Sequence, residues 1–414
     1  MQTQLEASIK NTPAGEEADA ILRSCVHCGF CLATCPTYQL LGDELDSPRG
    51  RIYLIKQVLE GAAPTQKTQQ HLDRCLTCRA CETTCPSGVQ YGRLLDIGRL
   101  RVEQQVERRL YMRLFRYGLR KILPNRQIFA ALVAVARLAR PLMPAKLKKS
   151  ISPASKTSLP VSNEHSQRVM LILDGCAQPV LKPSINLAAS RVLNRAGISL
   201  VSAPQAGCCG ALAYHLNAQE EGLDAMRRNI DAWWPYVVRQ KKPVEAIVMT
   251  ASGCGVTVKE YGHLLRHDDR YAQKAARISA LTKDIGEVLA AEKDRLAALL
   301  AETADLPHIA FHSPCTLQHG MRLNGVVENL LQSIGFKLAS VADAHLCCGS
   351  AGTYSLLQPQ LSKQLRANKL AALSKEKPDL LTTANIGCLM HLQAGTDLPV
   401  KHWIELLDEA LHWH

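Results

Sequence analysis

The sequence predicts an α+β protein in which a helical N-terminal domain is followed by two repeated α/β units. Three observations support this fold class. Eight of the 16 cysteines lie in two tight clusters within residues 1–107. From residue 168 onward, short apolar runs such as VMLIL and EAIVM alternate with helical patterns such as SINLAASRVLNRAG, which indicates βαβ units and a parallel sheet. The second half also repeats itself, with cysteines at matching intervals.

The N-terminal cysteines follow one spacing pattern twice. Each cluster reads C-x2-C-x2-C-x3-C-P and ends at Pro36 or Pro86. In this bacterial ferredoxin pattern three close thiolates hold one [4Fe–4S] cluster, while the fourth reaches the other cluster. We therefore expect two clusters, one held by Cys25, Cys28, Cys31 and Cys85 and the other by Cys75, Cys78, Cys81 and Cys35. A pair of zinc sites is the alternative, but zinc sites usually separate their cysteine pairs by a longer gap.

The segment between the two cysteine clusters is expected to be helical. Within RGRIYLIKQVLEG, Ile52, Ile55, Val58 and Leu59 have helical spacing. A small β-rich ferredoxin has no room for such a helix, so we predict a helical two-cluster ferredoxin-like domain over residues 1–107. His27 lies inside the first motif and is expected to pack or face solvent, because the motif is complete without it.

The net charge of +12 belongs to one segment, since residues 108–149 contain 12 basic residues and no acid. Within ERRLYMRLFRYGLRKIL, one helical face carries Arg109, Arg113, Arg116 and Arg120, and the other carries Leu110, Tyr111, Leu114, Phe115 and Ile122. Three interpretations stay open: the apolar face covers the protein's own core, the helix lies on an anionic membrane surface, or it docks on a partner. Residues 108–163 are predicted to be this helix and a linker.

Each repeat in the second half offers four thiolates. They are Cys176, Cys208, Cys209 and Cys254 in the first repeat (residues 164–295), and Cys315, Cys347, Cys348 and Cys388 in the second (residues 296–414). Each vicinal pair precedes a glycine, which permits close backbone approach. The single cysteines follow apolar runs, at the carboxyl ends of expected strands, where α/β sheets bind ligands. We expect at least one repeat to bind a further [4Fe–4S] cluster; a redox-active disulfide and packing cysteines are the alternatives.

Other cofactor motifs are missing from the sequence. It has no G-x-G-x-x-G after a strand and no P-loop, so we expect no NAD, FAD or ATP on this chain. Clusters carry electrons but not hydride, which implies a flavin partner. The N-terminus has no apolar signal region, and the longest apolar run, residues 128–136, is far shorter than the roughly 20 residues of a membrane span. These features favour a cytosolic or peripheral protein.

The motifs CVHCGFCLATCP, TASGCG, CCGSAGTY, TANIGC and HWIELL together resemble the iron–sulfur subunits of bacterial glycolate oxidases (glycolate dehydrogenases). This resemblance implies a complex with FAD-binding subunits, which oxidise glycolate to glyoxylate, while electrons leave through this chain toward a quinone or another acceptor. It implies no catalytic residue and no substrate activity on this chain alone. The expected location is the cytoplasm, or the inner face of the cell membrane with residues 108–149 as the contact.

Alternative functions come from the wider group with CCG domains. They are an iron–sulfur subunit of a lactate or glycerol-3-phosphate dehydrogenase, and a heterodisulfide-like thiol–disulfide reductase. Heterodisulfide reductases often place a fifth cysteine where this sequence has Thr257 and His391, so a five-cysteine cluster is not implied. His391 is expected to hydrogen-bond a cluster sulfur rather than to ligate iron. Nucleic acid is not an expected partner, because cluster-containing DNA glycosylases use one cluster with different cysteine spacing.

Overall fold

The computed structural model describes residues 1–142, 168–239, 243–300 and 306–412. The chain divides into two compact units. The first contains Met1–Tyr117 and His345–Lys369, and the second contains Gly118–Ala344 and Leu370–His414. Of the predicted linker, residues 143–163 lie outside the described residues.

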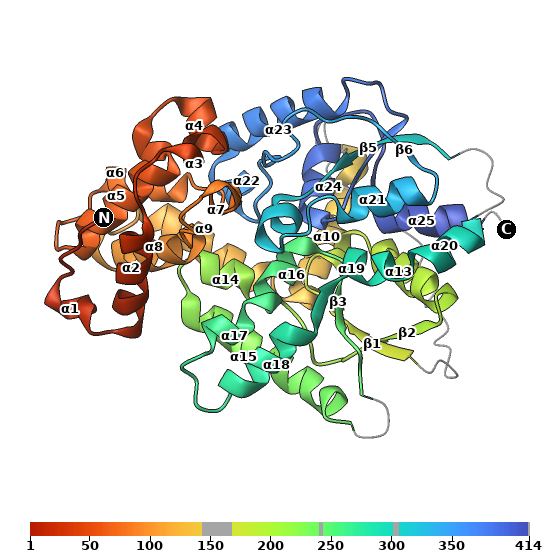
Figure 1. The fold of residues 1–414 in the computed structure, drawn as a ribbon, viewed down its shortest axis with the longest axis horizontal. Helices are drawn as coiled ribbons and strands as arrows, with labels where there is room; N and C mark the ends of the chain where they lie inside the picture. The colour runs from red at the N-terminus through yellow and green to blue at the C-terminus, as the bar shows by residue number, and fades with distance from the viewer. Residues whose placement is uncertain (143–167, 240–242, 301–305, 413–414) are drawn as a thin grey trace. The chain divides into compact units, whose positions relative to one another are not determined.

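The N-terminal part of the first unit is built from helices, drawn in red and orange in Figure 1. Its two long central helices, α5 (Pro48–Leu59) and α8 (Tyr91–Gln105), pack against each other. The other elements are α1 (Ala7–Lys10), α2 (Pro13–Ser24), α3 (Phe30–Ala33), α4 (Pro36–Leu41), η1 (Glu44–Asp46), α6 (Gln66–Asp73), α7 (Ala80–Thr84) and α9 (Leu110–Ile122), which continues into the second unit.

Local sequence signals explain the helix predicted between the cysteine clusters. The Ser47 hydroxyl accepts a hydrogen bond from the Gly50 amide at 3.0 Å and caps α5, and Pro48 occupies its first turn. The predicted face, Ile52, Ile55, Val58 and Leu59, is buried. A Cβ at Gly98 of α8 would lie 2.5 Å from the Ile55 side chain, so glycine lets the two helices approach closely. The prediction of a helical domain is confirmed.

A second part of the chain also belongs to the first unit. Residues His345–Lys369 include α22 (Tyr354–Leu357) and most of α23 (Pro359–Leu373). The Tyr354 hydroxyl donates a hydrogen bond to the Arg74 carbonyl at 3.1 Å, next to Cys75. Cys347 and Cys348 therefore belong to the same unit as the N-terminal cysteine clusters.

The described residues of the second unit form two four-stranded parallel sheets. The first, in the order β2-β1-β3-β4, contains β1 (Arg168–Ile172), β2 (Ile198–Ser202), β3 (Ile247–Met249) and β4 (Thr282–Asp284). The second, in the order β6-β5-β7-β8, contains β5 (His308–His312), β6 (Lys337–Leu338), β7 (Leu380–Thr383) and β8 (Val400–His402). The equivalent strand orders confirm two pseudo-repeated α/β units.

Helices connect and cover these strands (Figure 1). Around the first sheet, Leu171 and Ile247 of neighbouring strands pack in one core with Met226, Ile230 and Trp233 of the long helix α15 (Gln219–Val237). The described elements are α10 (Arg126–Ala139), η2 (Arg140–Leu142), α12 (Gln178–Leu181), α13 (Ser184–Arg195), α14 (Ala211–His215), α15 (Gln219–Val237), α16 (Ser252–Lys259), α17 (Tyr261–Leu264), α18 (Ala272–Leu281), α19 (Ile285–Ala290), α20 (Lys293–Leu300), η3 (Thr316–Gly320), α21 (Val326–Ser333), α24 (Ile386–Gln393) and α25 (Trp403–His412).

The structure contradicts one of the three interpretations of helix α9. Its apolar face does not cover the protein's own core: Leu110 is 64% exposed and Leu114 is 61% exposed, whereas Arg116 is only 8% exposed. Burial lowers the pKa of Arg116 to about 10. That interpretation is therefore wrong. The physical reason is that Arg116 lies near the carboxylates of Asp73 and Glu103, which also contact the preceding Arg108 at 2.6 Å and 2.7 Å. Arg109 and Arg113 on the same face stay exposed.

Within the described residues, no single helix has the length and hydropathy of a membrane span. Helices α9 and α10 meet these criteria only as a pair, and the pair is bent by 104° at the break between them.

Candidate metal centres

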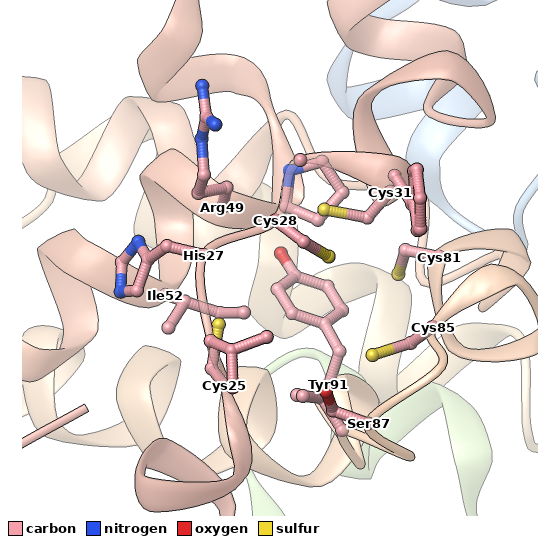
Figure 2. Close-up of a pocket in the computed structure, with 15 residues that line it drawn as sticks. Cys25, His27, Cys28, Cys31, Arg49, Ile52, Cys81, Cys85, Ser87 and Tyr91 are labelled. Atoms are coloured by element: carbon pink, nitrogen blue, oxygen red, sulfur yellow. The ribbon is translucent and has the colours of Figure 1, made fainter.

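The first pocket in the N-terminal domain is lined by Cys25, Cys28, Cys31, Cys85 and Cys81. Figure 2 shows their sulfur atoms around one space, whereas the side chains of His27 and Arg49 point away from it. Cys25 ends α2, Cys31 lies in α3 and Cys85 ends α7. Burial and the neighbouring Cys25 thiol raise the pKa of Cys31 to about 11. His27 instead lies with its Nε2 atom 3.5 Å from the Met1 sulfur.

A second pocket is lined by Cys35, Cys75, Cys78 and Cys81. Burial, and then the nearby Cys78 and Cys75 thiols, raise the pKa of Cys81. The Tyr91 hydroxyl donates to the Cys75 sulfur at 3.6 Å, and this tyrosine lines both pockets. The second pocket therefore lies next to the first.

The structure groups the eight cysteines across the two motifs. Cys85 joins the cysteines of the first loop, Cys35 joins those of the second, and Cys81 lines both pockets. Apart from Cys81, which lines both pockets, each lining contains the cysteines of one ligand set that the spacing predicts. The assignment of each thiolate to a cluster stays a prediction.

The backbones of the two cysteine loops have the same shape. His27 and Thr77, each two residues after the first cysteine of its motif, have φ angles of 55° and 52°. Gly29 and Arg79, each four residues after that cysteine, have φ angles of 85° and 61°. A left-handed conformation costs a non-glycine residue roughly 1–2 kcal/mol, so the surrounding structure must impose it. These left-handed residues turn the backbone of each loop so that its cysteines line a common pocket, as cluster binding requires.

The chemistry of the two pockets fits [4Fe–4S] clusters. The inward-facing donors are thiols, and burial disfavours the thiolate form there. Iron would supply the compensating positive charge, and all-thiolate donor sets of this spacing hold cubane clusters. The cysteines Cys25, Cys28, Cys31 and Cys85 would hold one group, and Cys35, Cys75, Cys78 and Cys81 the other.

A buried ion pair stands beside the second pocket. Arg51 and Asp46 are 1% and 0% exposed, and Arg51 Nη2 lies 3.2 Å from Asp46 Oδ1. Arg51 also donates to the His71 carbonyl at 2.7 Å and to Thr37 Oγ1 at 3.1 Å.

Thr37 Oγ1 in turn lies 3.3 Å from the Cys35 sulfur. Burial lowers the pKa of Arg51, but Cys75, Tyr91, Cys35 and Asp46 outweigh burial and raise it above its ordinary value. Sequence reasoning missed this ion pair because an arginine in an R-G-R helix start is normally exposed.

The four thiols of the first repeat come together in the second unit. Cys176 follows β1, Cys208 and Cys209 follow β2, and Cys254 lies in α16 after β3, at the carboxyl ends of three neighbouring strands. Hydrogen bonds from the Cys176 and Cys209 thiols hold the pKa of Cys208 well below its usual range. The pKa values of Cys176 and Cys209 are raised, first because they donate those bonds. This arrangement is suited to a metal cluster or to thiol–disulfide exchange.

Two buried side chains donate hydrogen bonds to the backbone carbonyls of the Cys208–Cys209 pair. The Asn229 amide donates to the Cys208 carbonyl at 2.9 Å, and the Tyr261 hydroxyl donates to the Cys209 carbonyl at 2.8 Å. Asn229 also donates to the Tyr261 oxygen at 3.1 Å. No local sequence pattern indicates these supports, because Tyr261 lies 52 residues from Cys209 in the chain.

Both CCG glycines are required by their backbone. Gly210 and Gly349 have φ angles of 90° and 87°. A Cβ at Gly210 would lie 2.5 Å from the Gly222 carbonyl oxygen, and one at Gly349 would lie 2.7 Å from the Ser362 carbonyl oxygen. The left-handed turn and the close backbone approach explain why glycine follows each cysteine pair.

The cysteines of the second repeat fall in both units. Cys347 and Cys348 lie in the first unit, where the Gly349 amide donates to the Cys347 sulfur at 3.4 Å. Cys315 and Cys388 lie in the second unit, where they follow β5 and β7.

Polar groups surround Cys388. The Asn385 amide donates to its sulfur at 3.5 Å, and a ring nitrogen of the buried His312 lies within 4.8 Å of it. Sequence reasoning missed His312, whose only signal was its place before the S-P-C turn. His391 is partly buried one turn after Cys388 on α24, and in the first repeat Thr257 donates to the Gly253 carbonyl at 3.1 Å.

Comparison with known proteins identifies the family. Residues 21–89 match the model of the 4Fe-4S dicluster domain, and residues 170–259 and 309–393 match the cysteine-rich domain. The chain is 54% identical over 411 residues to the glycolate oxidase iron–sulfur subunit of Escherichia coli (strain K12), covering 99% of both chains. The chain belongs to the glycolate oxidase iron–sulfur subunit family.

Two further relatives share a lower sequence identity with this chain. A probable glycolate oxidase iron–sulfur subunit of Bacillus subtilis (strain 168) is 31% identical over 94% of both chains. Lactate utilization protein A of Bacillus licheniformis is 27% identical over 56% of this chain and 96% of its own length. The predicted resemblance is confirmed, and the chain is an oxidoreductase subunit with an iron–sulfur electron-transfer role.

Proposed function

We propose that this chain is the electron-transfer subunit of a flavin-dependent glycolate dehydrogenase. FAD-binding partner subunits oxidise glycolate to glyoxylate, and this chain passes the electrons toward a quinone or another acceptor. The complex is cytoplasmic and peripheral on the inner face of the membrane, with the contact in residues 108–149. The observation that carries the proposal is the identity to a glycolate oxidase iron–sulfur subunit over nearly the whole chain.

The geometry of the first unit supports a one-electron carrier. Two thiol-lined pockets lie side by side and share Cys81 and Tyr91 in their walls. Clusters bound by Cys25, Cys28, Cys31 and Cys85, and by Cys75, Cys78, Cys81 and Cys35, would therefore be neighbours. Bound there, they supply one-electron chemistry, and the protein sets their potentials through burial, charge and hydrogen bonds to sulfur.

An anaerobic iron and sulfide count on the purified chain tests the cofactor content. Two [4Fe–4S] clusters correspond to about eight irons, and each occupied CCG repeat adds about four. We expect more than eight, because the first-repeat thiols Cys176, Cys208, Cys209 and Cys254 already gather in one place. A count of eight would contradict cluster binding at the repeats, and zinc in place of iron would contradict the proposal itself.

Single serine variants test which thiolates share a cluster. We expect Cys25→Ser and Cys85→Ser to remove the same EPR signal of the reduced protein, and Cys35→Ser and Cys75→Ser to remove the other. Ser87→Ala is the matched control, because Ser87 lines the first pocket without offering a thiol. If Cys35→Ser and Cys25→Ser remove the same signal, each motif binds its own cluster and the crossed assignment is wrong.

Dye-reduction assays separate the candidate functions. We expect no glycolate-dependent dye reduction by this chain alone, and activity when the flavoprotein subunits are added. Glycolate oxidation by the isolated chain would overturn the proposal. Activity of the assembled complex with lactate or glycerol 3-phosphate instead of glycolate would select an alternative substrate.

The hydrogen bonds between the Cys208 thiol and those of Cys176 and Cys209 give a specific reason to test thiol–disulfide exchange as well. Disulfide reduction that is lost in Cys209→Ser, with cluster content unchanged, would favour the reductase alternative. We expect the isolated chain to show no such activity.

A further inference from the structure

The two cysteine loops of the first unit have similar backbones but different surroundings. Each loop has one apolar residue after its first cysteine and another before its third. In the second loop these residues, Leu76 and Ala80, are 4% and 1% exposed. In the first loop the equivalent residues, Val26 and Phe30, are 67% and 61% exposed. The second loop shows that this backbone permits burial of both positions, so the exposed pair indicates a surface that another molecule covers.

This exposed pair lies at a candidate metal centre. Val26 and Phe30 line the first pocket together with its thiols, and Cys28 lies between them in the chain. Of the 16 cysteines, all of which lie in the described ranges, Cys28 alone is exposed. Figure 2 shows its sulfur among those of the first pocket. We name Val26, Cys28 and Phe30 the first-loop surface. Because electron transfer slows steeply with distance, a redox partner that docks here has the shortest route into this pocket.

The residues around the first-loop surface suit a protein partner. Arg49 and His27 line the same pocket, and no carboxylate is among its lining residues. Arg49, which contacts Glu44 at 2.8 Å, has a side chain that is 34% exposed. Protein–protein interfaces commonly have an apolar centre with aromatic and arginine side chains, and a polar rim around it. Phe30 with Val26 would form such a centre, and Arg49 with His27 its edge.

The second pocket instead lies near further thiols of this chain. Tyr354 is buried, and its hydroxyl donates to the Arg74 carbonyl next to Cys75. Burial raises the pKa of Tyr354, and the nearby Cys75 and Cys347 thiols raise it further. Tyr354 therefore lies close to a thiol of the second pocket and to one of the CCG pair in the same unit. Within the first unit, the first pocket opens toward another molecule and the second toward the chain's own cysteines.

The groups around the second pocket favour an electron there. Arg51 is buried beside it, and the Tyr91 hydroxyl and the Thr77 amide donate to the Cys75 sulfur at 3.6 Å and 3.4 Å. Positive charge and hydrogen bonds to sulfur stabilise the more negative, reduced form of a cluster. Water at the exposed Cys28 has the same effect on the first pocket, but a docked partner excludes that water. Electrons therefore enter at the first pocket, and the partner at the first-loop surface is the electron donor.

We propose that the first-loop surface docks the electron-donating FAD-binding subunit, with Val26 and Phe30 at the centre of the interface. In each transfer the reduced flavin of the partner loses one electron, and the cofactor held in the first pocket gains it. No bond forms or breaks on this chain, and the protons of glycolate oxidation leave from the partner subunit to solvent. The inference deepens the proposed function and rests on it, because that function supplies the donor.

Biolayer interferometry tests the docking surface without any substrate. The probe is the FAD-loaded partner subunits, and the immobilised protein is the full-length cluster-loaded chain. We expect Val26→Asn with Phe30→Gln to weaken binding more than about tenfold, because truncation of central apolar residues of an interface commonly costs that much. Leu356→Asn changes a residue that is 51% exposed in the same unit, and this matched control should leave the affinity unchanged.

Unchanged iron content and circular dichroism of the double variant establish that it is folded and loaded. Equal affinity of the double variant and the unchanged protein overturns the proposal. Photo-crosslinking does not depend on loss of binding, and it uses benzoylphenylalanine in place of Phe30 or, as the control, of Leu356. In the assembled complex we expect a crosslink from position 30 to an FAD-binding subunit and none from position 356. A crosslink from position 30 only to another protein, none at all, or equal crosslinks from both positions would contradict the proposal.

Stopped-flow mixing with glycolate-reduced partner subunits measures electron entry directly. The double variant should lose its cluster absorbance more slowly, in proportion to its weaker binding, whereas reduction by dithionite, which needs no docking, should be equally fast in both proteins. An unchanged rate with the partner subunits would overturn the proposal. If lactate reduces the partner subunits and glycolate does not, while the crosslink from position 30 is present, the proposed substrate is wrong and the docking surface is supported.

Discussion

Replacing Arg51 with methionine removes the positive charge buried beside the second cysteine pocket and keeps a side chain of similar length. Breaking a buried ion pair by removing one partner costs about 3–5 kcal/mol. Asp46 would keep its contacts with Arg74 at 2.7 Å and with His71 Nδ1 at 3.1 Å, which places the expected effect at the lower end. We therefore expect Arg51→Met to lower the free energy of unfolding of the first unit by about 3 kcal/mol.

The same substitution should lower the reduction potential of the cluster proposed at this pocket. Thr37 Oγ1 lies 3.1 Å from Arg51 Nη1 and 3.3 Å from the Cys35 sulfur. The distance from the arginine nitrogen to the Cys35 sulfur therefore cannot exceed the sum of these two distances. At that separation and an effective dielectric constant of about 20, Coulomb's law gives about 3 kcal/mol. For a one-electron couple this corresponds to a potential on the order of 100 mV lower, because a cation stabilises the more negative reduced form.

An anaerobic redox titration followed by EPR measures the potential, and urea unfolding followed by circular dichroism and cluster absorbance measures the stability. Arg49→Met is the matched control on the same helix, because Arg49 is 34% exposed and its partner Glu44 is 43% exposed. Exposed ion pairs contribute about 0–1 kcal/mol, so the control should change little. The reasoning is refuted if the two variants shift the unfolding midpoint equally, or if the potential in Arg51→Met rises or stays within about 20 mV.

Three further predictions concern other parts of the protein. Gly349→Ala should cost more than about 2 kcal/mol of stability, because a left-handed φ and a carbonyl at 2.7 Å oppose its Cβ, while Gly352→Ala, with nothing within 4 Å, should cost only the roughly 1–2 kcal/mol of the backbone; equal urea midpoints would contradict the steric argument. Burial and the nearby Glu287 raise the pKa of Asp284 to about 7, although Lys259 opposes the shift. The protonated Asp284 side chain therefore stabilises the fold at low pH, and this stabilisation is lost as pH rises toward 7. Burial lowers the pKa of His402 to about 4, although Glu405 opposes the shift. The neutral His402 side chain therefore stabilises the fold above pH 6.5, and this stabilisation is lost as pH falls toward 4. Unfolding midpoints between pH 4 and 8 should thus rise with pH more steeply in Asp284→Asn and less steeply in His402→Gln than in the unchanged protein, and parallel profiles for all three would show that these groups do not titrate as described. Tyr261→Phe should lower stability by about 1–3 kcal/mol, because it leaves the buried Cys209 carbonyl without its donor; a loss as small as that of an exposed tyrosine, such as Tyr53→Phe, would contradict this.

The features that sequence reasoning predicted are those with local signals. The motif spacing predicted two thiol groups, and Cys85 lines the pocket of the first motif while Cys35 lines the pocket of the second. The apolar spacing of Ile52, Ile55 and Val58 predicted α5, because a helix repeats its buried face every three to four residues. The repeat in the second half predicted two equivalent sheets. This signal is also local, because each strand is a short apolar run in the sequence.

The features that sequence reasoning missed depend on partners far away in the chain. Arg116 of α9 turns inward because the carboxylates of Asp73 and Glu103, which belong to other helices, lie near it. Tyr261 and Asn229 support a cysteine pair that lies 52 and 21 residues away in the chain. No local pattern contains such information, because a charged residue looks the same in sequence whether its partner is water or a buried carboxylate.

The sequence by itself determined how many thiol groups this protein has, their spacing and their order along the strands, because cysteine spacing and apolar periodicity are properties of short stretches of chain. Only the tertiary structure decided what surrounds them. It buried Arg51 with Asp46 beside Cys35, placed Cys347 and Cys348 in the same unit as the N-terminal cysteines, and left the apolar side of α9 exposed. The physical reason is that burial and charge compensation are settled between elements distant in sequence, where desolvation must be balanced by whichever partners the fold brings close.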